Sequence, residues 1–422
     1  ILQLNVINPL NENQLSEFMR SKAAVLLVEE GQPELIEMQI RAILQRHQTD
    51  FVDFYAHDVI PSVGELLPER VFEPIAEFLN KYIPAETNLG KVAKAYIARG
   101  DFAKSLFPVK VTPRPPTFCT GCPERPVFSQ MKINEMLTGK ADWHAGDVGC
   151  YGMAGFQPFL MSDSNMGMGA GLAAGAGITA LSKQKNVSVV GDGTLWHSAF
   201  NASAANAIYN KQDSTYIVLD NKWTAMTGAH ENPNAGKLMN GENMNTNMSI
   251  KDTFFAMGVK KLEKANPYDF KEFQSKLKKI QRDSKIPQVR VLISEAECQL
   301  QKQRGVRANR QKLLENHQRF EVERFHIDDE VCVGDHACIR FNGCPSLTLK
   351  DSPNELRPSM NAYVDNTCVG CGVCGEVAQM AKLCPSFIRV TKIENPSLIE
   401  KLSQWFKRKL VPTLCLDTKA VG

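Results

Sequence analysis

Apolar residues follow two different periods along this chain of 422 residues. In the first hundred residues, a continuous apolar run at 23–31 predicts a buried strand, and apolar residues at helical spacing from 33 to 47 predict a helix. The opening segment, 1–7, has the apolar content of another strand. This alternation of strand and helix predicts an open α/β unit over residues 1–105.

Three continuous apolar runs further along predict strands that are buried on both faces. They cover residues 186–192, 214–220 and 287–293, and helical patterns lie between them. Strands without a polar face are typical of parallel sheets covered by helices on both sides. We therefore predict a second α/β domain, with a parallel sheet, over residues 106–310. The proline-rich connector at 107–118 is expected to mark the boundary before it.

The chain changes character after residue 300. The stretch 301–324 is dense in charge and predicts a solvated helix or a linker, which we place at 311–330. Two cysteine-rich runs then occupy a small α+β domain at 331–392. An amphipathic helix is expected at 394–410, within a C-terminal tail that covers 393–422.

Composition excludes several classes of protein. With 49 basic and 46 acidic residues, the chain offers no electrostatic case for nucleic acid or a membrane surface as a partner. Its longest weakly polar stretch, 166–181, is too short and too rich in glycine for a membrane span. Twelve cysteines in a chain of this size, most of them in metal-binding patterns, predict a reducing cytoplasm and argue against a disulfide scaffold.

The run at 368–385 combines C-x2-C-x2-C spacing with a later Cys-Pro step, and 331–345 is a degenerate relative of it. In ferredoxin-like modules three such thiolates hold one cluster, and the distant cysteine before proline completes the other. A zinc knuckle or buried free thiols are the alternatives, although zinc sites usually pair two C-x2-C units. The pair of runs therefore predicts a module that carries electrons.

Crossed ligation divides the seven cysteines of these runs between two iron-sulfur clusters. A complete [4Fe-4S] cluster would be held by Cys344, Cys368, Cys371 and Cys374. The other cluster would be held by Cys332, Cys338 and Cys384, with Asp335 where a further cysteine is expected. Three states of that corner stay open: closure by the Asp335 carboxylate, an empty corner that gives [3Fe-4S], and, ranked third, ligation by His336.

Two polar residues, Asp192 and Asn221, end successive predicted strands. One crossover helix fits between them, so we expect the two side chains side by side at the carboxyl ends of parallel strands, where their oxygens suit Mg²⁺. A backbone carbonyl near Trp223 is the third expected ligand. Gly191 and Gly193 would let the main chain approach a diphosphate, and the helix from Thr194 would present free amides to it. A lone Gly-Asp-Gly is an ordinary turn, but with asparagine at this distance it indicates thiamin diphosphate.

Several motifs resemble the thiamin diphosphate-dependent 2-oxoacid:ferredoxin oxidoreductases, and most closely the alpha subunits of the indolepyruvate type. They are FCTGCPERP at 118–126, DVGCYGM at 147–153, DSNMGMGAG at 163–171, GDGTLWHSAF at 191–200, YIVLDNKWTAMTG at 216–228 and the two cysteine runs. Residues 1–105 are similar to the transketolase C-terminal-like domain of that family. The resemblance implies thiamin diphosphate, Mg²⁺ and three iron-sulfur clusters as cofactors. It also implies a hetero-oligomer with a small beta subunit, with ferredoxin and coenzyme A as partners and an aryl pyruvate such as indolepyruvate as the 2-oxoacid substrate.

The resemblance assigns further residues by their place in these motifs. It implies a third, proximal cluster on four cysteines, although Cys298 by itself would equally be a small buried apolar residue. It adds Gly167 to the cofactor site. His197, one turn into the helix after Gly-Asp-Gly, is expected to face the substrate as a catalytic residue, with a locally satisfied histidine as the alternative. Relatives often have histidine where this chain has Glu124. The proximal cysteines are Cys119, Cys122, Cys150 and Cys298.

Other expectations concern the ends of the chain and the substrate pocket. The abrupt start at Ile1 suggests that the family's N-terminal pyrimidine-binding domain, with its activating glutamate, is not included. Cys415 is expected to be a structural or free thiol. Trp196, Trp223 and Met226 flank the cofactor motifs and would either line the substrate pocket or pack.

Two other functions compete with the oxidoreductase. A non-redox thiamin-dependent decarboxylase would share Asp192 and Asn221 but would have no use for the patterned cysteines. An electron-transfer or scaffold subunit with an incomplete thiamin site is the other alternative.

Overall fold

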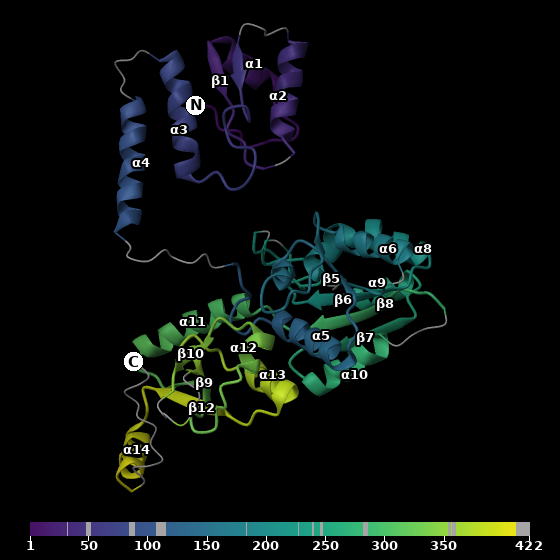
Figure 1. Cartoon of the computed structure of the whole chain (residues 1–422), viewed down its shortest axis with the longest axis vertical. Coiled ribbons are helices and arrows are strands. Elements are labelled where there is room, and N and C mark those ends of the chain that lie inside the picture. The colour runs from purple at the N-terminus through teal and green to yellow at the C-terminus, as the bar shows by residue number, and fades with distance from the viewer. Residues whose placement is uncertain are drawn as a thin grey trace. The chain divides into compact units, whose positions relative to one another are not determined.

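The computed structural model divides the chain into two compact units, Ile1–Arg114 and Pro115–Gly422 (Figure 1). It describes residues 1–31, 33–47, 52–83, 89–106, 115–182, 184–226, 228–238, 240–244, 248–281, 286–352, 356 and 360–410. The division falls inside the connector expected at 107–118, of which only residues 115–118 are described.

The first unit is a small α/β fold. Its order is α1 (Glu12–Arg20), β1 (Ala24–Leu26), α2 (Leu35–Arg46), β2 (Asp53–Tyr55), α3 (Pro68–Tyr82) and α4 (Leu89–Ser105). The helix predicted for 33–47 is confirmed by α2. The strand predicted for 23–31 is shorter and only half-buried, because β1 pairs with β2 alone among the described strands. Residues 1–7 form no strand, and no described strand pairs with them.

The second unit is built on a six-stranded sheet in the order β4-β3-β5-β6-β8-β7, with every pair parallel. The strands β5, β6 and β8 confirm the three predicted from continuous apolar runs. Interior strands of a parallel sheet need apolar residues on both faces, which explains why these runs do not alternate. The bounds are β3 (Trp143–Gly146), β4 (Ser164–Asn165), β5 (Asn186–Gly191), β6 (Ser214–Asp220), β7 (Lys261–Ala265) and β8 (Arg290–Glu295).

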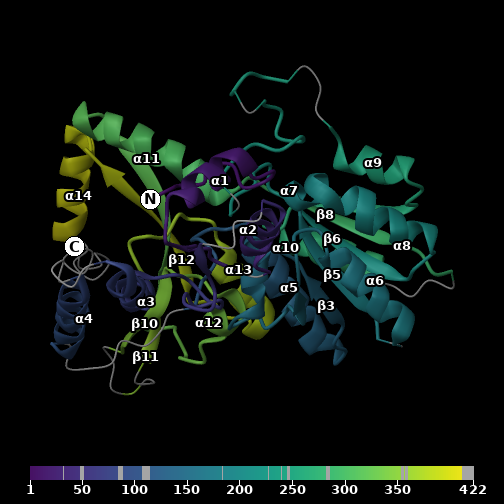
Figure 2. The same ribbon diagram turned by 90° about the horizontal axis from the view of Figure 1, so that it is seen from above.

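Helices cover both faces of this sheet (Figure 2). Along β6, Ile217 and Leu219 pack toward α5 (Glu124–Thr138) and α10 (Phe270–Gln281). The alternate residues Tyr216 and Val218 pack toward the opposite layer. That layer contains α6 (Gly171–Leu181), a π-helix over Leu195–Ala204, α8 (Ala205–Tyr209) and α9 (Ile250–Ala256). The result is a doubly wound α/β sandwich, as the sequence predicts.

Residues 320–394, here called the cysteine module, consist of two similar halves. The first contains β9 (Phe320–Ile327), α12 (Ala337–Asn342) and β10 (Leu347–Asp351), and the second β11 (Met360–Val364), α13 (Val373–Lys382) and β12 (Phe387–Glu394). In each half, a cysteine run begins after the first strand and continues into the helix, and a further cysteine follows the helix. The pairs β9 with β12 and β10 with β11 are antiparallel.

The segment predicted as a linker at 311–330 is different in the structure. It contains the end of α11 (Gln299–Glu315) and all of β9, which pairs with β12 along its whole length. The helix α11 has no buried residue, as expected of a solvated helix. The predicted amphipathic helix at 394–410 is confirmed by α14 (Leu398–Leu410).

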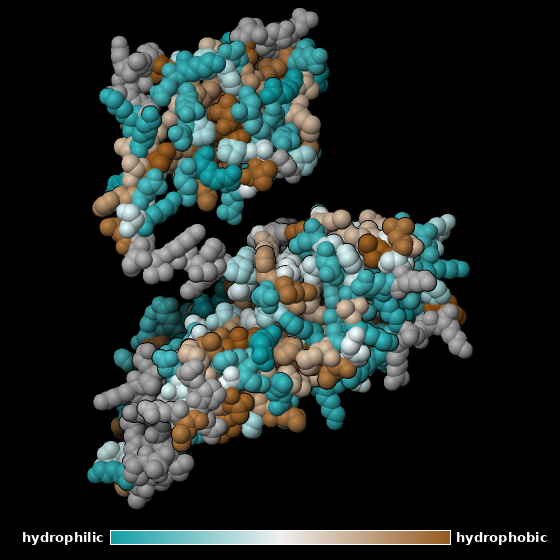
Figure 3. Space-filling view, viewed as in Figure 1, coloured by the Kyte–Doolittle hydropathy of each residue, from teal (hydrophilic) through white to brown (hydrophobic). Residues whose placement is uncertain are grey.

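The cysteine module packs on the sheet domain, so the two are parts of one compact unit. Ile133 of α5 and Phe270 of α10 form a buried apolar cluster with Val373 and Val377 of α13. In the described parts of the chain, no helix is long and apolar enough to cross a membrane. Hydrophilic and hydrophobic residues are mixed over the face of the molecule shown in Figure 3.

Candidate cofactor site

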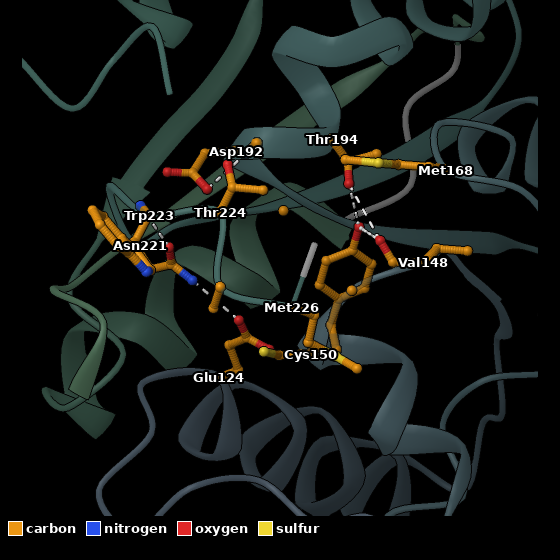
Figure 4. A pocket seen from close by; sticks show the side chains of 15 residues that line it. Glu124, Val148, Cys150, Met168, Asp192, Thr194, Asn221, Trp223, Thr224 and Met226 are labelled. Atoms are coloured by element: carbon orange, nitrogen blue, oxygen red, sulfur yellow. Dashed lines mark hydrogen bonds between the residues drawn. The ribbon is translucent and has the colours of Figure 1, made fainter. Parts of the chain in front are cut away.

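A pocket lies where the strand order of the sheet reverses. The strand β4 lies on one side of β3, and the later strands β5, β6 and β8 lie on its other side. In doubly wound sheets such a switch point opens a crevice at the carboxyl ends of the strands, where ligands bind. Figure 4 shows this pocket from close by. It is lined by Glu124, Val148, Gly149, Cys150, Tyr151, Met168, Gly191, Asp192, Gly193, Thr194, Asn221, Trp223, Thr224, Ala225 and Met226.

Asp192 and Asn221 meet in this pocket, as the strand spacing predicts, because β5 and β6 are neighbours with Gly191 opposite Leu219. The Lys222 amide donates a hydrogen bond to Asp192 Oδ2 at 2.8 Å, and the Trp223 amide donates to Asn221 Oδ1 at 3.0 Å. Lys222 has a φ of 61°, a left-handed conformation that is uncommon outside glycine and often found at functional sites.

The carboxyl groups of the pocket are buried and crowded. Burial raises the pKa of Asp192 to about 7, and Asp220 adds to this effect. Burial also raises the pKa of Glu124 to about 8, and the nearby Asp192 adds to it. Glu124 Oε1 accepts a hydrogen bond from Asn221 Nδ2 at 3.2 Å, while its buried Oε2 has no partner. Oxygen ligands with uncompensated negative charge suit a hard cation such as Mg²⁺, so these residues fit the expected ion.

Two glycines keep the wall of the pocket free of side chains. A Cβ added at Gly193 would lie 2.3 Å from Thr224 Oγ1, and one at Gly191 would lie 2.8 Å from the Tyr151 ring. The Tyr151 hydroxyl in turn lies 2.8 Å from Thr194 Oγ1 and connects the segment after β3 to the helix after β5. This close packing requires glycine at both positions, and their role toward a diphosphate stays a prediction.

Asp147 holds the loop before α6 against the end of β3. Its fully buried carboxylate accepts hydrogen bonds from the amides of Gly169 and Gly171, at 2.8 and 2.7 Å. Gly167, which the resemblance assigns to cofactor binding, is exposed and does not line the pocket, whereas its neighbour Met168 does. Sequence reasoning missed Asp147. The signal was available, since this aspartate directly follows a strand in the DVGCYGM motif.

The residues expected near the substrate fall into two groups. Trp223 and Met226 line the pocket. Trp196 instead packs against Phe200, with ring centres 4.8 Å apart, and donates a hydrogen bond to Asn234 Oδ1 at 3.0 Å. His197 is exposed on the π-helix and is not among the pocket residues, so its role stays a prediction.

Four cysteines, here called the proximal group, gather beside the pocket: Cys119, Cys122, Cys150 and Cys298. The first two lie in a turn before α5, in which the Cys122 amide donates to the Cys119 carbonyl at 3.0 Å. Cys150 lines the pocket, and the Cys298 amide donates to the Asn221 carbonyl at 3.1 Å. Burial raises the pKa of Cys150, and Glu124, Cys119 and Cys298 add to the effect, so the thiols influence one another.

A second cavity is lined by the four cysteines that crossed ligation predicts for one cluster. This near group consists of Cys344, Cys368, Cys371 and Cys374, and Arg125 of α5 also lines the cavity. Burial raises the pKa of Cys374, followed by the effects of the other three thiols. The four thiols therefore face one another across the cavity, although they come from both halves of the module.

The remaining group, here called the far group, consists of Cys332, Cys338 and Cys384 with Asp335. Burial raises the pKa of Cys338 to about 12, and Cys384, Cys332 and Asp335 add to the effect. Asp335 Oδ1 accepts a hydrogen bond from the Ala337 amide at 3.1 Å. His336 Nε2 lies 3.1 Å from the Met360 carbonyl oxygen, so its ring is engaged elsewhere.

The eleven cysteines among the described residues are free, and Cys415 lies outside that part of the chain. Within the described ranges, no three His, Cys, Asp or Glu side chains are arranged to hold a metal ion.

Residues 147–290 match the family model of the thiamine pyrophosphate enzymes, C-terminal TPP binding domain. This segment contains β5, β6 and most of the pocket, including Asp192 and Asn221. The sheet domain is therefore a thiamine pyrophosphate-binding domain.

Most of the chain is similar to indolepyruvate oxidoreductase subunit IorA. It is 29% identical to that subunit from Thermococcus kodakarensis and 28% identical to that from Pyrococcus horikoshii. Each comparison covers 89% of this chain and 55% of the relative, so the chain spans about half the length of these curated relatives. A solved 2-oxoglutarate:ferredoxin oxidoreductase from Magnetococcus marinus is 16% identical, with a TM-score of 0.38 over 44% of this chain and 66% of that chain.

Proposed function

We propose that this chain is the thiamin-binding subunit of a 2-oxoacid:ferredoxin oxidoreductase that decarboxylates an aryl pyruvate such as indolepyruvate. The observation that carries the proposal is the contact between the pocket and the proximal group. Cys150 lines the same pocket as Asp192, and the Cys298 amide is bonded to the Asn221 carbonyl. An oxidoreductase that transfers electrons from the pocket to iron-sulfur clusters requires this contact, whereas a non-redox decarboxylase does not.

The residues of the pocket have distinct tasks in this proposal. Thiamin diphosphate, when bound, would supply the carbanion chemistry that decarboxylation needs. Asp192, Asn221 and the Trp223 carbonyl would hold Mg²⁺ and through it the diphosphate. Gly191 and Gly193 would let the main chain approach the diphosphate. The Trp223 and Met226 side chains line the pocket, and we expect them to contact an aromatic substrate.

The three cysteine groups give the electrons a route out of the pocket. The proximal group lies next to the pocket, the near group follows in the cavity beside Arg125, and the far group completes the module. We infer one iron-sulfur cluster in each group, with ferredoxin as the external acceptor. Coenzyme A would receive the acyl group.

The assembly is also part of the proposal. The relatives are named as a subunit, and this chain spans about half their length. We therefore expect a hetero-oligomer with a smaller beta subunit. Free thiols in all eleven described cysteines are consistent with a reducing cytoplasm.

The test is the cofactor content of the anaerobically purified protein. We expect thiamin diphosphate, Mg²⁺, iron and labile sulfide together. Asp192→Ala should abolish thiamin retention and leave the iron content unchanged. The matched control is Asp252→Ala, which removes an exposed carboxylate from α9 and should leave both contents unchanged.

Three results would change the assignment. Iron without thiamin would contradict the oxidoreductase and favour an electron-transfer or scaffold subunit. Thiamin without iron would favour the non-redox decarboxylase. Loss of both cofactors in Asp192→Ala would contradict the separation of the pocket from the cysteine groups.

A further inference from the structure

Arg125 is a fully buried charge at the boundary between the sheet domain and the cysteine module. Its side chain is 0% exposed. Nη1 donates a hydrogen bond to Asn342 Oδ1 at 2.6 Å, and Nε donates to the Cys119 carbonyl at 3.3 Å. Nη2 is buried and has no hydrogen-bond partner. A buried guanidinium without a counter-charge is strongly unfavourable, so its surroundings should supply negative charge.

The groups around Arg125 that can carry negative charge are thiols. Arg125 lines the cavity of the near group. Although burial lowers the pKa of the guanidinium, Cys344, Cys371, Cys122 and Cys374 act in the opposite direction. No carboxylate in the described part of the chain is among these influences. One of the four thiols belongs to the proximal group and three to the near group, so Arg125 lies between the two.

The loops that carry the two groups are in direct contact. Gly121 has a φ of 76°, and a Cβ there would lie 2.4 Å from Val369 Cγ2. Thr120 Oγ1 lies 2.9 Å from Ser346 Oγ. Since Gly121 and Val369 each stand next to a cysteine of their group, this contact brings the proximal and near groups together around Arg125.

We propose that Arg125 is an electrostatic positioning residue for electron transfer between the proximal and near clusters, and that it raises the reduction potential of both. The proposal rests on the proposed function, since it requires iron-sulfur clusters in both groups. One electron leaves the proximal cluster and enters the near cluster, and no covalent bond forms or breaks. Arg125 keeps its proton throughout and acts as a fixed charge. Each reduced cluster has one more negative charge than its oxidised form, so a buried cation favours reduction.

The test is an EPR-monitored redox titration of the anaerobically purified protein, with iron content measured on the same samples. Arg125→Gln removes the charge and keeps a hydrogen-bonding side chain. We expect the potentials of the proximal and near clusters to fall, each by about tenfold or more in the one-electron equilibrium constant, which corresponds to about 59 mV. The far cluster should keep its potential and serves as an internal reference.

Two controls separate charge from packing. Arg125→Lys keeps the charge and loses the guanidinium hydrogen bonds, so it should restore most of the potential. Asn342→Ala removes the hydrogen-bond partner and keeps the charge, so the potentials should not fall. If Arg125→Gln loses its iron, the result for Arg125→Lys tests the proposal. Retention of iron and of the reduction potentials in Arg125→Lys would support the electrostatic role, and loss of both would contradict it.

The remaining outcomes distinguish this inference from the proposed function. Unchanged potentials in an iron-replete Arg125→Gln would overturn the role of Arg125 and leave the proposed function intact. Equal shifts in all three variants would show a structural role only. Unmodified protein without iron would overturn both proposals.

Discussion

The near and far groups each combine residues of one cysteine run with the cysteine that follows the helix of the other half, yet their surroundings differ. The near group lies where the module packs on the sheet domain, and Arg125 and Thr120 of that domain line its cavity. The far group is buried among residues of the module itself. The regular set of four cysteines occurs at the domain boundary, and Asp335 takes a cysteine position at the other site. If both sites hold clusters as proposed, the near site would carry electrons between the two domains, because residues of both domains line its cavity.

The largest expected effect comes from Cys371→Ser in the near group. We expect loss of iron from this site and no electron delivery to an external acceptor, because the route from the proximal group passes through it. Reduction of the proximal cluster by substrate should persist. Cys338→Ser in the far group is the matched control, and it should leave the EPR signals of the proximal and near clusters in place. Equal loss of all signals in both variants would show that the sites are not independent.

The role of Asp335 at the far site can be tested by counting the iron atoms of its cluster. If its carboxylate closes the corner of the far cluster, Asp335→Asn should remove one iron and give the EPR signal of an oxidised [3Fe-4S] cluster. If the corner is empty, that signal is present in the unmodified protein, and Asp335→Cys should remove it by admitting a fourth iron. Absence of a three-iron signal in all three proteins would contradict a role of Asp335 at this corner.

Packing between the sheet domain and the module is tested by Ile133→Ala. Ile133 is fully buried against Phe270, Val373 and Val377, so we expect a loss of about 2–5 kcal/mol in the free energy of unfolding. Leu137→Ala in the same helix is the control. Leu137 is 64% exposed, so its replacement should change stability by no more than about 0.5 kcal/mol. Denaturant unfolding measures both. Similar midpoints for the two variants would contradict the buried boundary.

The smallest expected effect concerns the hydrogen bond between Thr120 and Ser346. Its loss in Thr120→Ala should cost about 0.5–1.5 kcal/mol in stability. Thr138→Ala is the control, because the Thr138 hydroxyl bonds within α5, to the Asn134 carbonyl at 2.8 Å. Both variants are measured in the same unfolding experiment, and no cost for Thr120→Ala would show that this bond does not stabilise the boundary.

Much of the site could be predicted from the sequence because its information is local. The interval between Asp192 and Asn221 is one strand crossover, and that is enough to bring them together at neighbouring strand ends. The cysteine spacing likewise predicts the near group as a set. These features depend on backbone geometry that short motifs specify.

Two other features could not be predicted in this way. Arg125 donates a hydrogen bond to Asn342, which lies 217 positions away. No local sequence pattern predicts that a particular arginine will be buried.

The strand β9 is the other feature, because its charged residues favour the prediction of a linker. Phe320 and Val322 alternate with Glu321 and Glu323, which lie on the more exposed face. This period of two is typical of a strand.

The most direct test of the account is reduction of the clusters by substrate. Indolepyruvate and coenzyme A would be added, without air, to the protein as its host produces it with its partner subunit, and visible absorbance and EPR would be recorded. We predict bleaching of the iron-sulfur absorbance and EPR signals from reduced clusters, and neither change in Asp192→Ala with its full iron content. Clusters that stay oxidised in the thiamin-replete protein with every 2-oxoacid tried, yet are reduced by dithionite, would contradict the claim that this pocket supplies their electrons.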